Sequence, residues 1–523
     1  MAPRTQGRRG APARVRSTPR PPERGPHTRH TGERPSHARE FRCEDALALS
    51  CTTHFLVLFD VSVMTVALPS IQSDLGFTPS GLQWVVSAYT LAFAGLLLLG
   101  GRLADLYGHR RVFTAGLAVF TVASLLGGLA TDPATLIAAR ADRARRRVLA
   151  PLSLTMLTTS FPEGPSRTRA LTIWTAVALA GGAAGNLLGG LLTEYLSWRS
   201  VLLVNVPVGI PAALFGLRVL ARRGAPERAV RLDLPGAVLA TAALTLLTFG
   251  VAQAHTHAWS DPRTALPLLG GGAALVAFAV VEARFAATPL IPPRLFRLPG
   301  IGWGNLAMLL AGASQVPLWY FLTLTMQDVL GYSAAQTGLG FLPHAAVMLL
   351  VSLRLIPLLM RRVQARVLIA TGAIVEAGGF WWQSAITPDS GYVTGILGPA
   401  VLLSLGGGLL STPLTRTVTS GVSHADAGAA SGLMNTTRQF GGAFGLAVVL
   451  TLTATGTTGA PGARRAGGEL RGRFLSMAVI LLVLAGAHAL LPALRDSRSG
   501  ARPGAGAGEN TDGADGDTRP AVR

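Results

Sequence analysis

An acidic residue interrupts a long apolar run near the start of the chain. Asp60 lies in the middle of "FLVLFDVSVMTVALPSI". A carboxylate at the centre of a membrane-spanning helix costs about 2.5–3.5 kcal/mol, so it normally faces a cavity and has a function. Because burial disfavours the charged form, Asp60 is a candidate for binding and releasing protons near neutral pH. The alternative interpretation is a structural hydrogen bond between helices.

The polar stretch "GRLADLYGHRRVF", residues 101–113, carries a second group of candidates. A glycine, an acid, a second glycine and paired arginines follow in order: Gly101, Asp105, Gly108, Arg110 and Arg111. The glycines allow a tight turn, the acid favours the start of the next helix, and the arginines hold the loop in the cytoplasm. This ordered pattern is more specific than an ordinary basic loop.

The composition indicates an integral membrane protein with many spans. Of 523 residues, 49% are hydrophobic and 14% are charged, about half the charged fraction of a soluble protein. The net charge of +20 comes from arginines in the first 42 residues and between apolar runs, which argues against nucleic-acid binding. With two cysteines, no metal-ligand spacing and no phosphate-binding glycine loop, we expect no metal, no cofactor and no enzyme.

About fourteen apolar runs are long enough to cross a bilayer, since a span needs roughly 20 residues. They cover residues 46–68, 82–101, 112–131, 134–157, 170–192, 200–220, 232–253, 265–286, 300–322, 338–359, 366–386, 392–414, 432–455 and 474–494. Arginines concentrate in alternate loops, which places both termini in the cytoplasm. The loop with Arg464, Arg465, Arg471 and Arg473 is an exception, because it falls outside in this topology.

Several motifs in this order resemble the major facilitator superfamily, and more narrowly its fourteen-span drug:proton antiporters. They are the Asp60 run, the 101–113 loop, "LTEYLSWRSVLLVNVPVG", "PLIPPRLF", "QDVLGYSAAQTGLGFLP" and "ASGLMNTTRQFGGAFGLAV". The resemblance extends over residues 46–494. It implies that Asp60 couples transport to protons and that the 101–113 loop latches one conformational state.

The fold implied by the resemblance is two six-helix bundles plus two extra central helices, with a substrate cavity between the halves at mid-membrane. The expected segments are an Arg/Pro-rich disordered tail at 1–45, bundles at 46–220 and 300–494, a two-helix linker at 221–299, and a disordered tail at 495–523. Aromatic and amide side chains are possible cavity residues: Trp84, Tyr89, Asn205, Gln315 and Trp319.

Glycines recur every fourth residue in the expected span 170–192. Gly181, Gly185 and Gly189 share one helical face, which allows two helices to touch along their backbones. The stretch resembles the antiporter motif of the superfamily, in which a proline follows the central glycine. Asn186 stands at that position here, so the kink attributed to the proline is in doubt, and Asn186 could hydrogen-bond to a neighbour instead.

The expected fourth span contains an arginine cluster, "RADRARRRVLAP" at 140–151. Arg140 matches a cavity-facing arginine of the family that is implied in proton exchange. The following charges, Asp142 and four arginines, would cost on the order of 10 kcal/mol, where the family has small residues. A local frame shift across 141–148, genuine degeneration and a tolerated variant are the three interpretations.

These observations favour a monomeric, proton-coupled exporter of small amphipathic compounds such as antibiotics, in the bacterial cytoplasmic membrane. A transporter of one specific metabolite is the first alternative. A degenerate membrane protein that transports nothing is the second, motivated by the arginine cluster. Its partners would be protons, a small-molecule substrate and the lipid bilayer.

Overall fold

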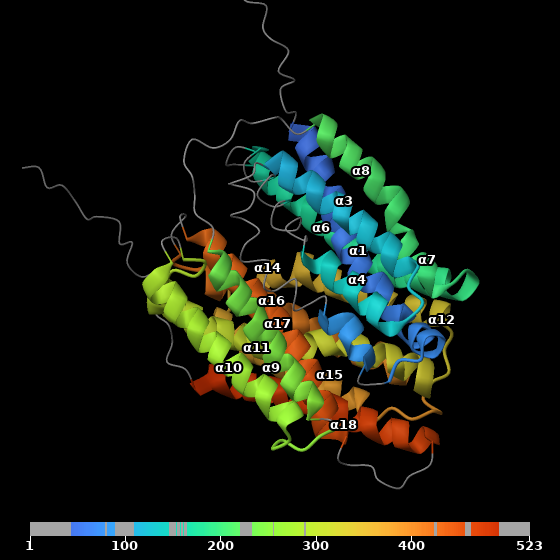
Figure 1. The fold of residues 1–523 in the computed structure, drawn as a ribbon. Helices are drawn as coiled ribbons and strands as arrows, with labels where there is room; N and C mark the ends of the chain where they lie inside the picture. Colours follow the sequence, from blue (N-terminus) through green and yellow to red (C-terminus); the bar gives the residue numbers. More distant parts are fainter. Residues whose placement is uncertain are drawn as a thin grey trace, which may run out of the picture. The chain divides into compact units, whose positions relative to one another are not determined.

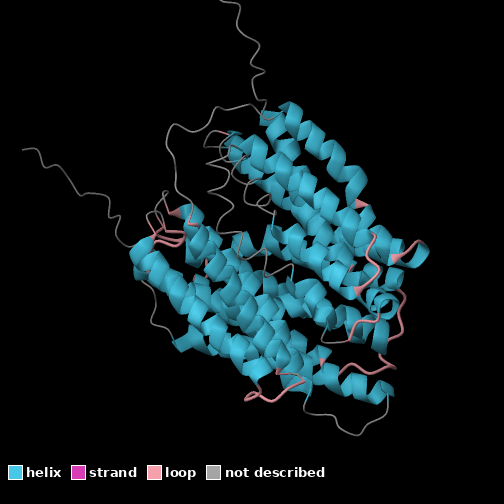
Figure 2. Ribbon diagram, viewed as in Figure 1, coloured by secondary structure: helices cyan, strands magenta, loops and turns pink. Residues whose placement is uncertain are grey.

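The structure is a computed structural model, and every regular element among its described residues is a helix (Figures 1 and 2). It describes residues 43–78, 81–88, 109–145, 153, 157, 160–161, 165–219, 233–254, 256–286, 289–422, 426–454 and 462–490. The tails, most of the 101–113 loop and residues 146–152 therefore lie outside the described part.

The first group of helices packs around α1, the long helix that carries Asp60. Its members are α1 (Cys43–Leu75), α3 (His109–Gly128), α4 (Pro133–Arg145), α6 (Pro165–Tyr195), α7 (Trp198–Leu203) and α8 (Asn205–Val219). Gly76 follows α1 with φ 67°, a left-handed conformation that ends a helix without strain. Asp132 caps α4 by accepting a hydrogen bond of 2.9 Å from the Thr135 N–H.

Two helices form a hairpin between the bundles, α9 (Leu234–Gln253) and α10 (Pro262–Val280), the latter continued by η1 (Val281–Phe285). Asp233 and Asp261 cap their first turns, each followed by a proline in the first turn. The Glu282 carboxylate accepts hydrogen bonds from the Leu290 and Ile291 N–H groups, both 3.2 Å long. This carboxylate ties the end of the hairpin to the segment that enters the second bundle.

The second group packs around α11 and α16. Its elements are η2 (Pro293–Arg297), α11 (Pro299–Leu324), η3 (Thr325–Val329), α12 (Ala334–Gly340), α13 (Leu342–Leu350), η4 (Val351–Leu355), α14 (Ile356–Leu359), α15 (Ala365–Gln383), η5 (Val393–Leu397), α16 (Gly398–Thr419), α17 (Ala427–Ala454) and α18 (Gly462–Leu490). Figure 1 shows α9 and α10 beside this group, and α9 contacts α17.

Nine helices within the described residues are long and apolar enough to cross a membrane. Each of the expected apolar runs overlaps helix in the described residues, although some helices end a few residues before the run does. The membrane-spanning, all-helical class is therefore confirmed, while the count of fourteen stays a prediction.

The two bundles touch near the C-terminal end of α6. There the Glu194 carboxylate accepts a hydrogen bond of 2.7 Å from the Ala335 N–H at the start of α12. The Gln327 side-chain amide donates to the Val66 carbonyl oxygen of α1 over 2.9 Å. In each contact a side chain of one bundle binds a main-chain group of the other, so the two bundles meet there at close range.

The last arginine-rich segment does not follow the concentration of arginines in cytoplasmic loops, and the structure explains this exception at one position. Arg473 is paired with Glu469 at 2.9 Å, and its guanidinium lies 5.3 Å from the centre of the Phe321 ring. Its side chain is only 12% exposed. Arg473 therefore serves packing and pairing and carries little information about orientation.

Candidate functional site

Asp60 is fully buried and lies against polar groups from two other helices. The Asn205 amide, at the first residue of α8, donates a hydrogen bond of 3.0 Å to Asp60 Oδ1. Arg140 of α4 places its Nη1 3.9 Å from Asp60 Oδ2 and donates from Nε to the Val85 carbonyl oxygen over 2.8 Å. Three residues identified separately in the sequence thus form one cluster.

This cluster is suited to exchanging a proton. An ionised carboxylate is stabilised by the nearby guanidinium and the amide donor. Because Asp60 and Arg140 are 0% and 3% exposed, the pair sits in a low-dielectric environment where loss of one charge weakens the attraction strongly. Protonation of Asp60 would therefore loosen the contact between α1 and α4.

The glycine face of α6 packs directly on α1. Its members are Gly181, Gly185 and Gly189. A Cβ atom at these positions would lie 2.7–2.8 Å from carbonyl oxygens of α1, those of Phe55, Phe59 and Val63 in that order. Side chains larger than hydrogen do not fit there, so the predicted backbone contact is present.

Asn186 lies beside this glycine face and is buried. Its carbonyl oxygen would be 2.5 Å from a Cβ at Gly338 of α12, so α6 also approaches the second bundle at backbone distance. Asn186 stands between two close helix contacts, where the family's proline would remove a backbone N–H.

A second polar cluster lies within the second bundle, and sequence analysis recognised only part of it. Glu376 of α15 is 1% exposed, and its Oε2 lies 3.4 Å from the Nε2 of Gln315 on α11. The same Nε2 lies 3.3 Å from the Ser411 hydroxyl oxygen on α16. The positive charge of Arg438, on α17, acts on the Glu376 carboxylate.

Glu376 was missed, although its signal was present in the sequence. It sits mid-way through the expected span 366–386, as Asp60 does in its own span. The rule that an acid inside an apolar run is functional by default applies equally to both.

The remaining cavity candidates divide between the described and undescribed parts of the chain. Trp319, one turn from Gln315, is half-buried and packs edge-on against His344 at 4.7 Å between ring centroids. Trp84 packs on Phe249 of α9, with 5.8 Å between the ring centroids. Several predicted residues lie outside the described residues: Tyr89, Gly101, Asp105 and Gly108. Arg110 and Arg111 fall in the first turn of α3, where Arg111 is exposed.

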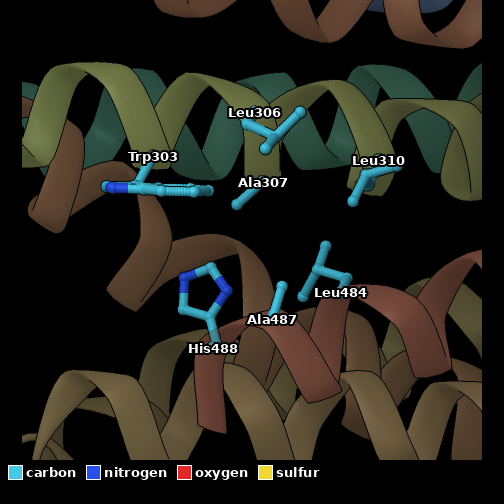
Figure 3. Close-up of a pocket in the computed structure, with 7 residues that line it drawn as sticks. All are labelled: Trp303, Leu306, Ala307, Leu310, Leu484, Ala487 and His488. Carbon is cyan, nitrogen blue, oxygen red and sulfur yellow. The ribbon is translucent and has the colours of Figure 1, made fainter. Parts of the chain in front are cut away.

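Figure 3 shows a small groove between α11 and α18. Its lining is mostly apolar: Trp303, Leu306, Ala307, Leu310, Leu484, Ala487 and His488. None of these residues belongs to either polar cluster. Within the described chain, no group of three His, Cys, Asp or Glu side chains could hold a metal ion.

An ion pair fixes the entry to the second bundle. Arg294 of η2 donates to Asp426 twice, from Nη2 over 2.6 Å and from Nε over 3.1 Å. The hydrogen bond to the Asp426 carboxylate raises the pKa of Arg294 above its ordinary value, so this arginine stays charged. In the first bundle, Asp74 accepts hydrogen bonds of 2.8 Å from both Trp198 Nε1 and Arg199 Nη1.

Comparison with known proteins identifies relatives over most of the chain. Residues 50–446 match the sequence model of the Major Facilitator Superfamily. The cephamycin export protein CmcT of Amycolatopsis lactamdurans is 70% identical over 86% of this chain and 93% of its own. The puromycin resistance protein of Streptomyces alboniger is 41% identical over 79% and 82% of the two chains.

A more distant relative is the tetracenomycin C resistance and export protein of Streptomyces glaucescens, 32% identical over 76% of this chain and 74% of its own. Among solved structures, the POT family transporter PepTSo superposes with a TM-score of 0.62. It covers 85% of this chain and 97% of its own at 13% identity, a likeness of fold alone.

Proposed function

The chain belongs to the Major Facilitator Superfamily, and on that premise we propose that it exports antibiotics in exchange for protons. It is a multi-pass protein of a bacterial membrane, a transporter rather than an enzyme. The proposal places it in the cytoplasmic membrane as a monomer, with both termini in the cytoplasm. The relatives named for cephamycin export, puromycin resistance and tetracenomycin C export support antibiotics as the substrates.

The observation that carries proton coupling is the buried Asp60 cluster. Asp60 is fully buried between the Asn205 amide and the Arg140 guanidinium. The Asp60 carboxylate takes up a proton when the external side is accessible, which removes the charge that holds Arg140. The proton leaves to the cytoplasm after reorientation, and the restored carboxylate attracts Arg140 again.

The other predicted sites take supporting parts in this proposal. The 101–113 loop controls the inward-closed state through Asp105 and its neighbours. The glycine face of α6 keeps α1 in place, so that movement of α6 is transmitted to Asp60. Arg140 reaches Asp60 from α4 and takes part in the proton exchange.

Transport into everted membrane vesicles tests the proposal. Vesicles energised by respiration are offered cephamycin and puromycin, and uptake is followed together with proton release. We expect uptake that collapses when a protonophore is added, and proton efflux on addition of substrate. Uptake that survives the protonophore, or no uptake of either compound, would contradict proton-driven antibiotic export.

A further inference from the structure

Arg438 is accessible although it lies near the middle of the 28-residue helix α17. Its carbonyl oxygen faces Gly312 of α11, where a Cβ atom would overlap it, so this part of α17 is pressed into the bundle. The side chain is nevertheless exposed, and its positive charge acts on the Glu376 carboxylate, although no direct ion pair joins the two among the described residues.

The partner charge is enclosed and held in place. Glu376 is 1% exposed, and a Cβ at Gly406 of α16 would lie 2.7 Å from the Glu376 Cα atom. The backbones of α15 and α16 are therefore in contact at this level, and the carboxylate has little freedom to move. The Gln315 side-chain amide donates hydrogen bonds to both Glu376 and Ser411, which links the three helices of the cluster.

Access to the two charges is therefore unequal. A molecule that approaches the cluster meets the Arg438 guanidinium, because the Glu376 carboxylate is covered. A guanidinium binds a carboxylate through two parallel hydrogen bonds, and more strongly in a site partly removed from water. Glu376 compensates the arginine when no ligand is bound, so the charge is tolerated inside the bundle.

We propose that Arg438 binds an anionic group, such as a carboxylate, of the exported compound, with Glu376 and Gln315 as positioning residues. This inference rests on the proposed export function. The ring of Trp319 lies one turn from Gln315 on the same face of α11 and is held by Phe341 and His344. It supplies a flat apolar surface, further along α11 from the level of Arg438, for the body of such a compound.

A matched pair of probes tests the charge preference: a cephamycin with a free carboxylate and the same compound as its methyl ester. Binding to purified full-length protein is measured by quenching of tryptophan fluorescence, and export is measured in everted vesicles. Arg438→Gln should weaken binding and export of the free acid about tenfold or more, since a charged hydrogen bond is lost. The ester should change less than about twofold.

Arg438→Lys keeps the charge and loses the two-pronged geometry, so its effect on the free acid should lie between wild type and Arg438→Gln. Arg416→Gln, an exposed arginine in the last turn of α16, is the matched control and should change neither probe. Melting curves of each variant show whether it is folded, and Arg438→Lys decides the matter where Arg438→Gln is unstable.

Binding separates this inference from the proposed function. A free acid that binds wild type and loses affinity in Arg438→Gln supports the assignment even in vesicles that show no export. Equal weakening of acid and ester, or no binding of the acid to wild-type protein, overturns it. Failure of protonophore-sensitive export alone would instead refute proton-driven export.

Discussion

Each bundle buries an acidic residue beside an arginine, but the two pairs differ in access. In the first bundle both partners are enclosed, Asp60 at 0% and Arg140 at 3% exposure. In the second bundle Glu376 is 1% exposed while the Arg438 side chain is exposed. The same residue types therefore suit different tasks. A pair that is buried on both sides is accessible to little more than a proton, whereas an exposed arginine can bind a ligand.

The helices around the two pairs are packed in a similar way. In the first bundle, glycines of α6 lie on carbonyl oxygens of α1. In the second, Gly312 and Gly441 bring α11 and α17 together, and a Cβ at either would overlap a carbonyl oxygen of the other helix. Close backbone contact thus supports both pairs, and the difference in access arises from the side chains.

The largest effect should follow from Asp60→Asn, which keeps the shape and removes the proton-binding group. We expect antibiotic export against a gradient to be lost while binding of the compound persists. Proton release on substrate addition measures the coupling. Asp74→Asn, at the exposed end of the same helix, is the control and should retain export. Retained coupling in Asp60→Asn would show that the pair of Asp60 and Arg140 is structural.

The glycine face should show the next effect, on stability. A Cβ at Gly185 would lie 2.7 Å from the Phe59 carbonyl oxygen, whereas one at Gly182 would lie 3.6 Å from the Ser62 hydroxyl oxygen. Gly185→Ala should lower the free energy of unfolding by about 1–3 kcal/mol through overpacking. Gly182→Ala should be neutral or slightly stabilising. Thermal unfolding in detergent compares them, and equal melting temperatures would contradict the predicted overpacking.

Asn205→Leu removes the hydrogen-bond donor to Asp60 and tests how much this donor contributes to proton coupling. A hydrogen bond to a charged group contributes about 1.5–3 kcal/mol, so we expect proton-coupled export to fall about tenfold or more. Asn305→Leu is the matched substitution in the second bundle, where the amide bonds only to Ile301 of its own helix among the contacts described. An Asn205→Leu protein with the wild-type rate would indicate that Arg140 alone tunes Asp60.

The smallest effect should come from the exposed ion pair at the entry to the second bundle. Arg294 is 65% exposed on its side chain, and exposed pairs contribute little because water screens them. A double-mutant cycle of Arg294→Gln and Asp426→Asn should give a coupling close to the error of melting curves. A large coupling would mean that this ion pair governs the assembly of the bundle.

The sequence predicted the family, the helical membrane fold and the members of the first cluster. Asp60 was visible because an acid stands out in an apolar run, and Asn205 because it lies in a recognisable motif. Their contact with Arg140 could not be derived, since it depends on how α1, α4 and α8 cross. The glycine face was predictable as a contact, but its partner helix was not.

Other placements depended on tertiary packing that no local pattern encodes. Trp84 was expected at the cavity, and its ring packs on Phe249 of the linker hairpin, a contact that its sequence neighbours do not predict; its place in the cavity stays a prediction. Arg473 pairs with Glu469 one turn away, and its guanidinium lies over the Phe321 ring, a contact that the sequence alone does not predict. Glu376 was predictable as an acid inside an apolar run, but it lies outside the motifs that carry the family resemblance.

The contact between the bundles near the end of α6 has a consequence for the rate of the transport cycle. Glu194 and Gln327 hold main-chain groups of the opposite half, and Gly190 lies against the backbone of Ala334. Rotation of a side chain, which takes picoseconds to nanoseconds, cannot open such a contact. Whole helices must separate, a collective motion of microseconds to milliseconds. Separation of the helices at this end would then be the rate-limiting step of the transport cycle. The turnover rate would depend steeply on temperature, even where the proton transfer itself is fast.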